Sequence, residues 1–210
     1  MPKTIVKIGP MDDGRQMSLD DFDEAEVQPG FHYELSRGII TVSDVPDLKH
    51  FAMVNEVRRQ LGRYDLEHPG RIFGIAGSGE CKIPLREYQS ERHPDLAVYM
   101  TPPPGEGSIW GMWIPEIVVE IISARSRHRD YEEKPDEYLQ FGISEYWILD
   151  EEKRKMVVLK RSKENGASKA LSRQNFISQV CCPAWSFLAK RYSRLRKQQA
   201  SRNLLPHKMK

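Results

Sequence analysis

The chain has 210 residues, of which 39% are hydrophobic and 30% charged, a balance typical of a folded globular protein rather than a disordered one. No apolar run approaches the roughly 20 residues of a membrane-spanning helix, and the first residues lack the apolar stretch of a signal peptide. Three cysteines without a CxxC pair argue against a disulfide framework and a structural zinc site. We therefore expect a cytoplasmic protein without membrane association.

The net charge of +2 hides an asymmetry along the chain. Residues 165–210 hold ten Lys or Arg and no acid, whereas residues 1–164 hold all 30 acids against 22 bases, which gives +10 and −8. A basic tail can attract nucleic acid or simply be a solvated terminus, and composition leaves both open. We expect an irregular segment over residues 1–17, one folded domain over 18–192 and a basic tail over 193–210.

In chain order, residues 1–30 are polar and acidic with little periodicity, and we expect them to be irregular. Residues 31–42 predict two short strands around a central Arg-Gly turn, because polar and apolar residues roughly alternate. Residues 50–66 predict a helix with one apolar stripe, stopped by a Pro-Gly pair. Residues 71–85 predict strand, turn and strand. The glycines at the centre of this segment lack the GK[ST] ending of a phosphate-binding loop and favour a hairpin turn.

The second half of the chain predicts a sheet with a crossover. Residues 95–100 predict a strand, and residues 115–123 are apolar on both faces, as in a central strand covered on both sides. A helix is expected over residues 125–141, followed by strands over 144–150 and 155–161. Because strand, helix and strand follow one another, we predict an α/β (α+β) fold with one central mixed sheet flanked by helices.

Glu120 is the most informative polar residue, because its neighbours in the strand are apolar on both faces. Burying a bare carboxylate costs several kcal/mol unless a partner offsets the cost. Glu120 therefore requires a cation nearby, which could be a bound metal, a lysine or an arginine. A purely structural ion pair accounts for its burial as well as a metal site does.

Asp95 opens the strand before Glu120, and two carboxylates on neighbouring strands can share one Mg²⁺ ion. Asp130, Lys134 and Tyr138 are spaced by four, so on a helix they form one polar stripe that could face Glu120. A lysine there can orient an attacking water and offset phosphate charge. Asp130 and Tyr138 are then accessory candidates. An exposed Asp130–Lys134 helix pair worth about 0.3–0.5 kcal/mol explains the same spacing.

Together these motifs resemble the PD-(D/E)XK nuclease superfamily. Within it they resemble the Uma-type family of proposed restriction endonucleases, which is expanded in cyanobacteria. The ordered set is more specific than any single piece, and it spans roughly residues 18–192. The matching pieces are YELSRG (33–38), His50, HPDLAVY (93–99), PEIVVEIIS (115–123), the Asp130, Lys134 and Tyr138 spacing, GISEYWILD (142–150) and CPAWSFLAKRY (182–192).

The resemblance implies roles for individual residues. Asp95 matches the Asp of the PD motif and Glu120 the metal-binding acid of the second strand, so these two would hold Mg²⁺ or Mn²⁺. The superfamily has a lysine two residues after that acid, where this chain has Ile122. The family resemblance moves the lysine to the following helix, at Lys134. Glu34 would be an accessory acid, with a surface Glu at a strand edge as the equal alternative.

Pro135 directly follows Lys134 and disfavours helical geometry in the residue before it, so we expect the helix to begin or kink there. The resemblance implies a Mg²⁺-dependent endonuclease that hydrolyses DNA, with residues 18–192 as its restriction-endonuclease-like domain. The missing strand lysine, Pro135 and the basic tail favour an alternative, a catalytically silent DNA-binding or interaction protein that keeps the fold. A homodimer is left open, because two-fold symmetry is common among oligomers.

Overall fold

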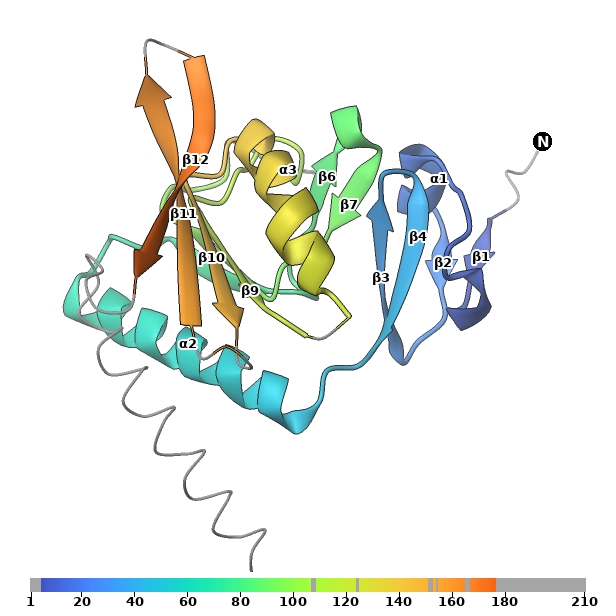
Figure 1. Cartoon of the computed structure of the whole chain (residues 1–210), viewed down its shortest axis with the longest axis horizontal. Helices are drawn as coiled ribbons and strands as arrows, with labels where there is room; N and C mark the ends of the chain where they lie inside the picture. Colours follow the sequence, from blue (N-terminus) through green and yellow to red (C-terminus); the bar gives the residue numbers. More distant parts are fainter. Residues whose placement is uncertain are drawn as a thin grey trace, which may run out of the picture.

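A six-stranded mixed sheet forms the centre of the protein, with helices on its faces (Figure 1). Its strand order is β12 (Ala167–Phe176), β11 (Lys155–Glu164), β10 (Glu145–Asp150), β9 (Ile117–Ile121), β8 (Leu96–Tyr99) and β5 (Gly74–Gly77). The predicted α/β class is thereby confirmed. The computed structural model describes residues 5–106, 109–123, 125–150, 153, 155–164 and 167–176, with side chains as far as residue 161.

A separate antiparallel sheet stands beside the central one (Figure 1). Its strand order is β4 (Ile39–Asp44), β3 (Phe31–Ser36), β7 (Ser90–Arg92) and β6 (Ile83–Leu85). The two strands predicted within residues 31–42 are confirmed, and the central mixed sheet that was predicted is accompanied by this second sheet. The hairpin predicted over residues 71–85 is wrong, because β5 pairs with β8 and β6 pairs with β7. The glycine-rich turn therefore leads the chain from one sheet to the other.

The N-terminal region is more ordered than its composition suggested. Its described part contains β1 (Lys7–Ile8), the 3₁₀ turn η1 (Pro10–Asp12), α1 (Leu19–Asp23) and β2 (Glu26–Val27). β1 pairs in parallel with β2. Ile8 and Leu19 share a buried cluster with Tyr33 of β3. The expectation of an irregular segment is therefore wrong for this part, because its few apolar residues pack against the second sheet.

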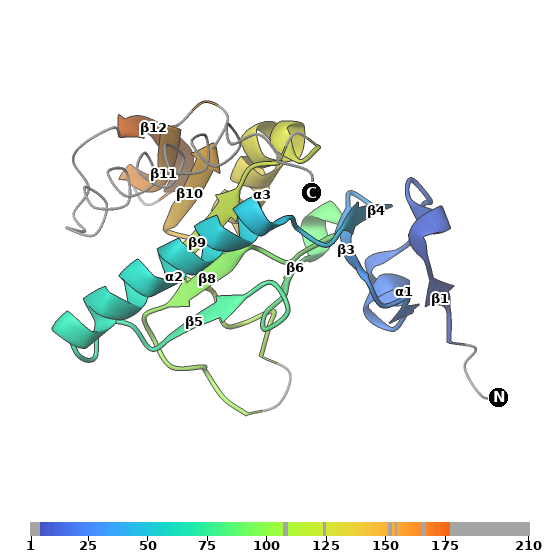
Figure 2. The ribbon, with the colours of Figure 1, turned by 90° about the horizontal axis from the view of Figure 1, so that it is seen from below.

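One face of the central sheet is covered by α2 (Leu48–Glu67), which confirms the helix predicted over residues 50–66. Asp47 caps the helix by accepting hydrogen bonds from two backbone N–H groups of the first turn. Val57 and Leu61 on its buried side pack against β8, β9 and β10. Figure 2 shows α2 lying across β8 and β9.

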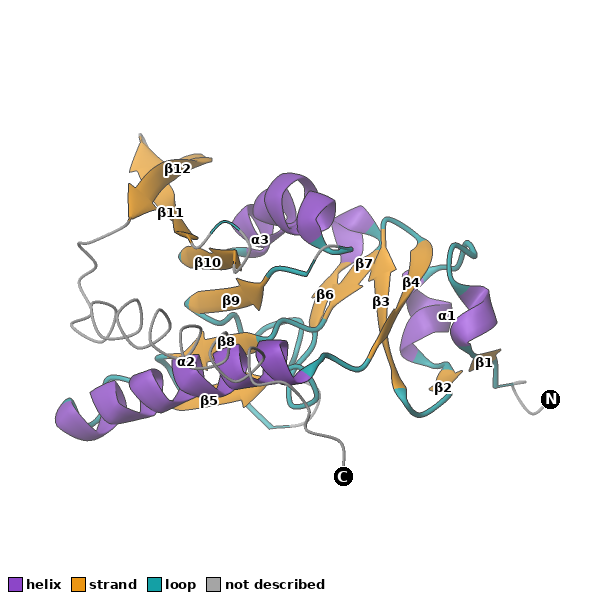
Figure 3. Cartoon of the chain, turned by 60° about the horizontal axis from the view of Figure 1, so that its bottom comes forward, coloured by secondary structure: helices purple, strands orange, loops and turns teal. Residues whose placement is uncertain are grey.

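The opposite face is covered by the crossover between the parallel strands β9 and β10 (Figure 3). It consists of a π-helical turn, η3 (Arg129–Glu133), that runs directly into α3 (Lys134–Phe141). The helix predicted over residues 125–141 is confirmed from residue 127 onward, and α3 itself begins directly before Pro135, as the proline indicated. It ends at Gly142, whose φ of +110° favours glycine.

The π-helical turn explains how Pro135 is accommodated. The N–H of Lys134 donates to the carbonyl of Arg129, five residues back. The next acceptor in this pattern is the carbonyl of Asp130, and Pro135 has no N–H to donate to it. The hydroxyl of Tyr146 on β10 donates to that carbonyl instead, at 2.9 Å. A side chain of the sheet thus replaces the missing backbone donor and fixes the crossover to β10.

The remaining predictions have mixed outcomes. The strands predicted over residues 144–150 and 155–161 correspond to β10 and β11, while β7 and β12 were not predicted. The basic tail (193–210) and the CPAWSFLAKRY segment (182–192) lie outside the described residues. Where the structure is described, it contains no helix with the length and apolarity to cross a membrane.

We predict that Tyr146→Phe lowers the free energy of unfolding by about 1–3 kcal/mol, because it leaves the buried Asp130 carbonyl without a donor. Pro135→Ala supplies a backbone N–H to the same carbonyl, so Tyr146→Phe should cost less in that background. Urea denaturation of the two single variants and the double variant measures this coupling. Strictly additive costs would contradict this account of the π-helical turn.

Candidate active site

Lys134 stands at the centre of a buried cluster of carboxylates. Its Nζ lies 2.8 Å from Oε1 of Glu120, 2.9 Å from Oδ1 of Asp130 and 3.7 Å from Oε1 of Glu34. Lys134 is 3% exposed and Asp130 is 1% exposed, so the alternative of a solvent-exposed helix pair is wrong. The cation that burial of Glu120 requires is therefore Lys134.

Glu34 reaches this cluster from β3, a strand of the second sheet. Its side chain is 16% exposed, which excludes the alternative of a surface residue at a strand edge. The backbone N–H of His93 donates to Glu34 at 3.3 Å. Burial alone would raise the pKa of Glu34, but neighbouring cations, Lys134 first among them, outweigh burial and lower this pKa to about 2.

Glu120 is held at the same oxygen by two donors. Its Oε1 accepts hydrogen bonds from Nζ of Lys134 and from the hydroxyl of Tyr138, each at 2.8 Å. Burial raises the pKa of the Glu120 carboxyl to about 8 against the opposing charge of Lys134, and the neighbouring carboxylates add to the shift. Tyr138 thus joins the cluster with its hydroxyl directed at the strand acid.

Asp95 lies across from Glu120 on the neighbouring strand. β8 and β9 pair with Leu96 opposite Val119, and one further step in this antiparallel register brings Asp95 opposite Glu120. Oδ2 of Asp95 accepts the backbone N–H of Ile121 at 2.7 Å. Asp95, directly before β8, and Glu120, on β9, are thus brought close together at this end of the paired strands.

His50 also holds Asp95, and residue patterns alone did not indicate this contact. Its Nε2 lies 2.8 Å from Oδ1 of Asp95. Burial would lower the pKa of His50, but the hydrogen bond to Asp95 and the charges of Asp95 and Glu120 raise it above its usual value. The only sequence signal was the place of His50 in the family resemblance, at the start of the first long helix.

Arg92 of β7 joins the second sheet to the crossover and was not predicted. Its side chain is fully buried, and its Nε and Nη2 bind the two carboxylate oxygens of Glu137 on α3 at 2.8 and 3.1 Å. Nη2 also donates to the Ser36 hydroxyl at 2.8 Å, and Nη1 lies 3.5 Å from Glu34. A bidentate pair of this kind fixes both charge and orientation. Arg92 thereby ties β3, β7 and α3 together around Lys134.

The donor set suits a hard divalent cation held by two carboxylates. Asp95 and Glu120 offer oxygens from adjacent strands, and no described residue donates to Oε2 of Glu120. Carboxylate oxygens are ligands that Mg²⁺ prefers, with waters completing its shell. Within the described part of the chain, three or more His, Cys, Asp or Glu side chains nowhere gather as a ready metal cage. A metal here would therefore rely on two protein acids and solvent.

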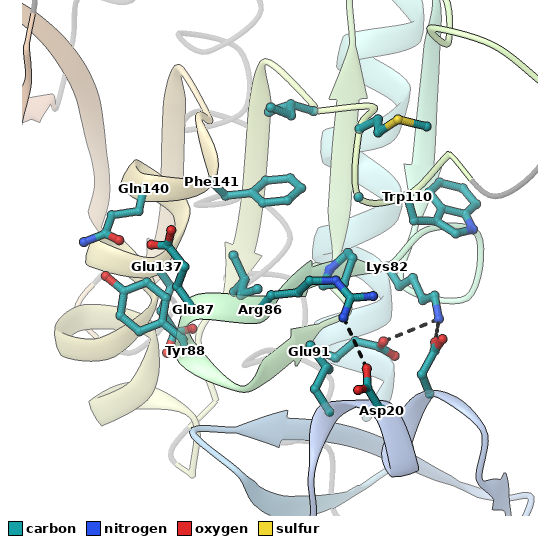
Figure 4. Close-up of a pocket in the computed structure, with 17 residues that line it drawn as sticks. Asp20, Lys82, Arg86, Glu87, Tyr88, Glu91, Trp110, Glu137, Gln140 and Phe141 are labelled. Carbon is teal, nitrogen blue, oxygen red and sulfur yellow. Dashed lines mark hydrogen bonds and ion pairs between the residues drawn. The ribbon is translucent and has the colours of Figure 1, made fainter.

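A cavity of about 450 Å³ lies apart from this cluster (Figure 4). Its walls come from α1, the β6–β7 hairpin, residues 110–114 and the end of α3. Lys82 pairs there with Asp23 and, at 3.4 Å, with Glu91. None of the predicted site residues lines this cavity, so the candidate site is the buried cluster around Lys134.

A mixed sheet covered on both faces by helices defines an α/β protein. A model of the Uma2 family, described as "Putative restriction endonuclease", matches residues 19–189, and the chain belongs to this family. The family that the sequence motifs suggested is thereby confirmed.

Among solved structures, the chain is similar to a crystal structure from Anabaena variabilis ATCC 29413, described as a putative nuclease belonging to DUF820. The TM-score is 0.61 at 19% sequence identity, over 85% of this chain and 99% of that chain. At this identity the likeness shows the shared fold alone. No curated protein matches the chain.

We predict that Arg92→Met lowers the free energy of unfolding by about 3–5 kcal/mol, because it removes the bidentate partner of the buried Glu137 and leaves only the half-exposed Arg37 at 3.7 Å. Adding Glu137→Leu should recover much of that loss, since it removes the uncompensated charge. Urea denaturation measures both effects, and Arg63→Met, at an exposed ion pair on α2, is the matched control with a change of roughly 0–1 kcal/mol. Equal losses in the Arg92 and Arg63 variants would contradict the proposed link between the sheets.

Proposed function

We propose that this protein is a metal-dependent endonuclease that hydrolyses phosphodiester bonds in DNA, with Asp95 and Glu120 as the ligands of one Mg²⁺ or Mn²⁺ ion. The observation that carries the proposal is the cross-strand placement of the two acids with Lys134 2.8 Å from Glu120. Membership of the Uma2 family supports the same function. When bound, the ion would lower the pKa of a water and offset negative charge on the phosphate.

The residues of the chain have separable tasks in this proposal. Lys134 offers an ammonium group that can orient the attacking water and stabilise developing phosphate charge. Asp130 holds that ammonium group from the helix side, and Glu34 from the second sheet. Tyr138 fixes the Glu120 carboxylate by its hydrogen bond. These accessory groups position the acids and the lysine before substrate arrives.

Two hydrogen bonds hold the carboxylate of Asp95. The backbone N–H of Ile121 and the ring of His50 each take one of its oxygens, which orients the carboxylate along the sheet face. Each of those oxygens keeps a further lone pair for a cation. Similar hydrogen bonds orient metal-binding carboxylates in other proteins, and their loss typically costs 10- to 100-fold in metal affinity or activity.

We predict that Asp95→Asn and Glu120→Gln each reduce cleavage of a supercoiled plasmid by roughly 100-fold or more, because each removes a charged ligand at constant shape. Lys134→Met should reduce cleavage to a similar degree. Rates are measured with Mg²⁺ and Mn²⁺, and with EDTA as the metal-free condition. Thermal unfolding shows that each variant is folded.

The matched control is Glu67→Gln, an exposed acid at the far end of α2 that pairs with Arg63 at 2.7 Å. It should cleave at the wild-type rate. Metal-dependent cleavage that survives both the Asp95 and the Glu120 changes would assign the activity to another site.

A second function is favoured by one observation, the close contacts that Lys134 already makes with two carboxylates. A lysine that neutralises acids permanently would leave a catalytically silent protein that binds DNA. The +10 charge of residues 165–210 supports DNA binding in both cases. This alternative predicts binding without cleavage under every metal condition.

We predict that deleting residues 193–210, which carry six Lys or Arg, weakens binding to duplex DNA and flattens its salt dependence. Each lost phosphate contact lowers the slope of log K against log salt by about 0.9. Fluorescence anisotropy of a labelled duplex at several salt concentrations measures both quantities. Unchanged affinity and slope would remove the tail from the interaction with DNA.

A further inference from the structure

Arg129 is an arginine at the edge of the candidate site whose side chain has no partner among the described residues. It opens the π-helical turn η3 and directly precedes Asp130. Its Nε is buried and has no hydrogen-bond acceptor. No described carboxylate lies within ion-pair distance of its guanidinium group, and no described residue accepts a hydrogen bond from it. The rest of the residue is half-buried, so a ligand from solvent can reach it.

The unpaired Nε of Arg129 lies near the acids of the candidate site, where a partner would be expected. Arg129 is close enough to Glu34 for its positive charge to contribute to the lowered pKa of that carboxyl. Burying a guanidinium donor unpaired costs free energy, so a fold that only needed stability would pair it with a neighbouring acid. Nε of Arg129 is instead left unpaired on the residue that directly precedes Asp130 of the site.

The other cations of the site are already engaged. Lys134 contacts Glu120 and Asp130 at 2.8 and 2.9 Å. Arg92 is fully buried and bound in bidentate fashion to Glu137. A DNA phosphate entering a cluster of four carboxylates therefore meets repulsion from the acids and finds these two cations occupied. Nη1 of Arg92 also lacks a hydrogen-bond partner, but that side chain is closed to solvent, whereas Arg129 combines an unpaired donor with partial exposure.

We infer that Arg129 binds a non-bridging oxygen of the DNA phosphate at the candidate site. The planar fork of a guanidinium group matches a phosphate through two parallel hydrogen bonds, which an ammonium group cannot supply. The inference rests on the proposed function, because it assigns the contact that brings the substrate of that site against Lys134. It adds a substrate-binding residue that contacts the phosphate without taking part in metal binding.

The experiment measures binding apart from cleavage. A labelled DNA duplex is titrated with full-length protein in Ca²⁺, another oxygen-seeking divalent ion, and the dissociation constant is read by fluorescence anisotropy. Arg129→Met should weaken binding roughly tenfold or more, as loss of a charge-assisted hydrogen bond does. Arg129→Lys should recover only part of the loss, because it restores the charge without the fork. Arg63→Met is the control with the same charge change on the distant end of α2.

Two further measurements, the unfolding temperature and the single-turnover cleavage rate, distinguish a substrate contact from a structural role of Arg129. The unfolding temperature of Arg129→Met should equal or exceed that of the wild type, since an unpaired buried charge is removed. The single-turnover cleavage rate in Mg²⁺ should fall along with affinity. Equal affinity and rate in Arg129→Met and Arg63→Met would overturn the inference, as would a lower unfolding temperature with unchanged DNA affinity.

Failure of the proposed function gives a different pattern. A wild-type protein that binds DNA through Arg129 without cutting it would refute the nuclease proposal and support the phosphate contact. Cleavage that depends on Asp95 and Glu120 but not on Arg129 would support the nuclease proposal and refute the phosphate contact. A wild-type protein that binds no DNA would overturn both.

Discussion

The buried ion pair between Glu120 and Lys134 is the constraint on which the rest of the structure depends. A carboxylate in the middle of a central strand is costly to bury, and its partner must come from outside the strand. The crossover after β9 delivers that partner, with Nζ 2.8 Å from the carboxylate. The position of Lys134 depends on where α3 begins over the sheet. That start is fixed by the π-helical turn, by Pro135 and by the hydrogen bond from the hydroxyl of Tyr146.

The second sheet contributes charged residues to the cluster around the Glu120–Lys134 pair. Lys134 alone cannot balance the acids around it. β3 adds a further acid, Glu34, and β7 brings the cation Arg92 to within 3.5 Å of that acid. Arg92 then binds Glu137 one helical turn beyond Lys134, so the helix is held by charge from the sheet beneath it and from the sheet beside it. Electrostatics thus joins two sheets that share no backbone hydrogen bonds among the strands described.

The sequence predicted what short-range patterns encode. The apolar run around Glu120 was sufficient to predict a buried acid, and the proline after Lys134 a helix start. The repeat of four fitted an exposed pair equally well, and the family resemblance assigned Lys134 to the site. Pairing between distant strands was not predictable in the same way. β5 and β6 read as a hairpin because their partners, β8 and β7, lie farther along the chain. Arg92 and His50 gave no local signal, because their partners come from other elements.

Because the lysine of the site lies on α3 and not on β9, its distance from Glu120 depends on how α3 packs against the sheet. Ile122, where the superfamily has its lysine, lies on the same side of β9 as Glu120 and packs in the cluster of Tyr138. A lysine on the strand would keep its distance from Glu120 however the helix moved. With Lys134 on α3, that distance depends on how the helix is docked, and therefore on Tyr146 and Arg92. Ile122 contacts the apolar cluster of Tyr138, and Arg92 binds Glu137 on the same helix. Both contacts hold α3 against the sheets, and they thereby set the distance from the ammonium group of Lys134 to the two acids.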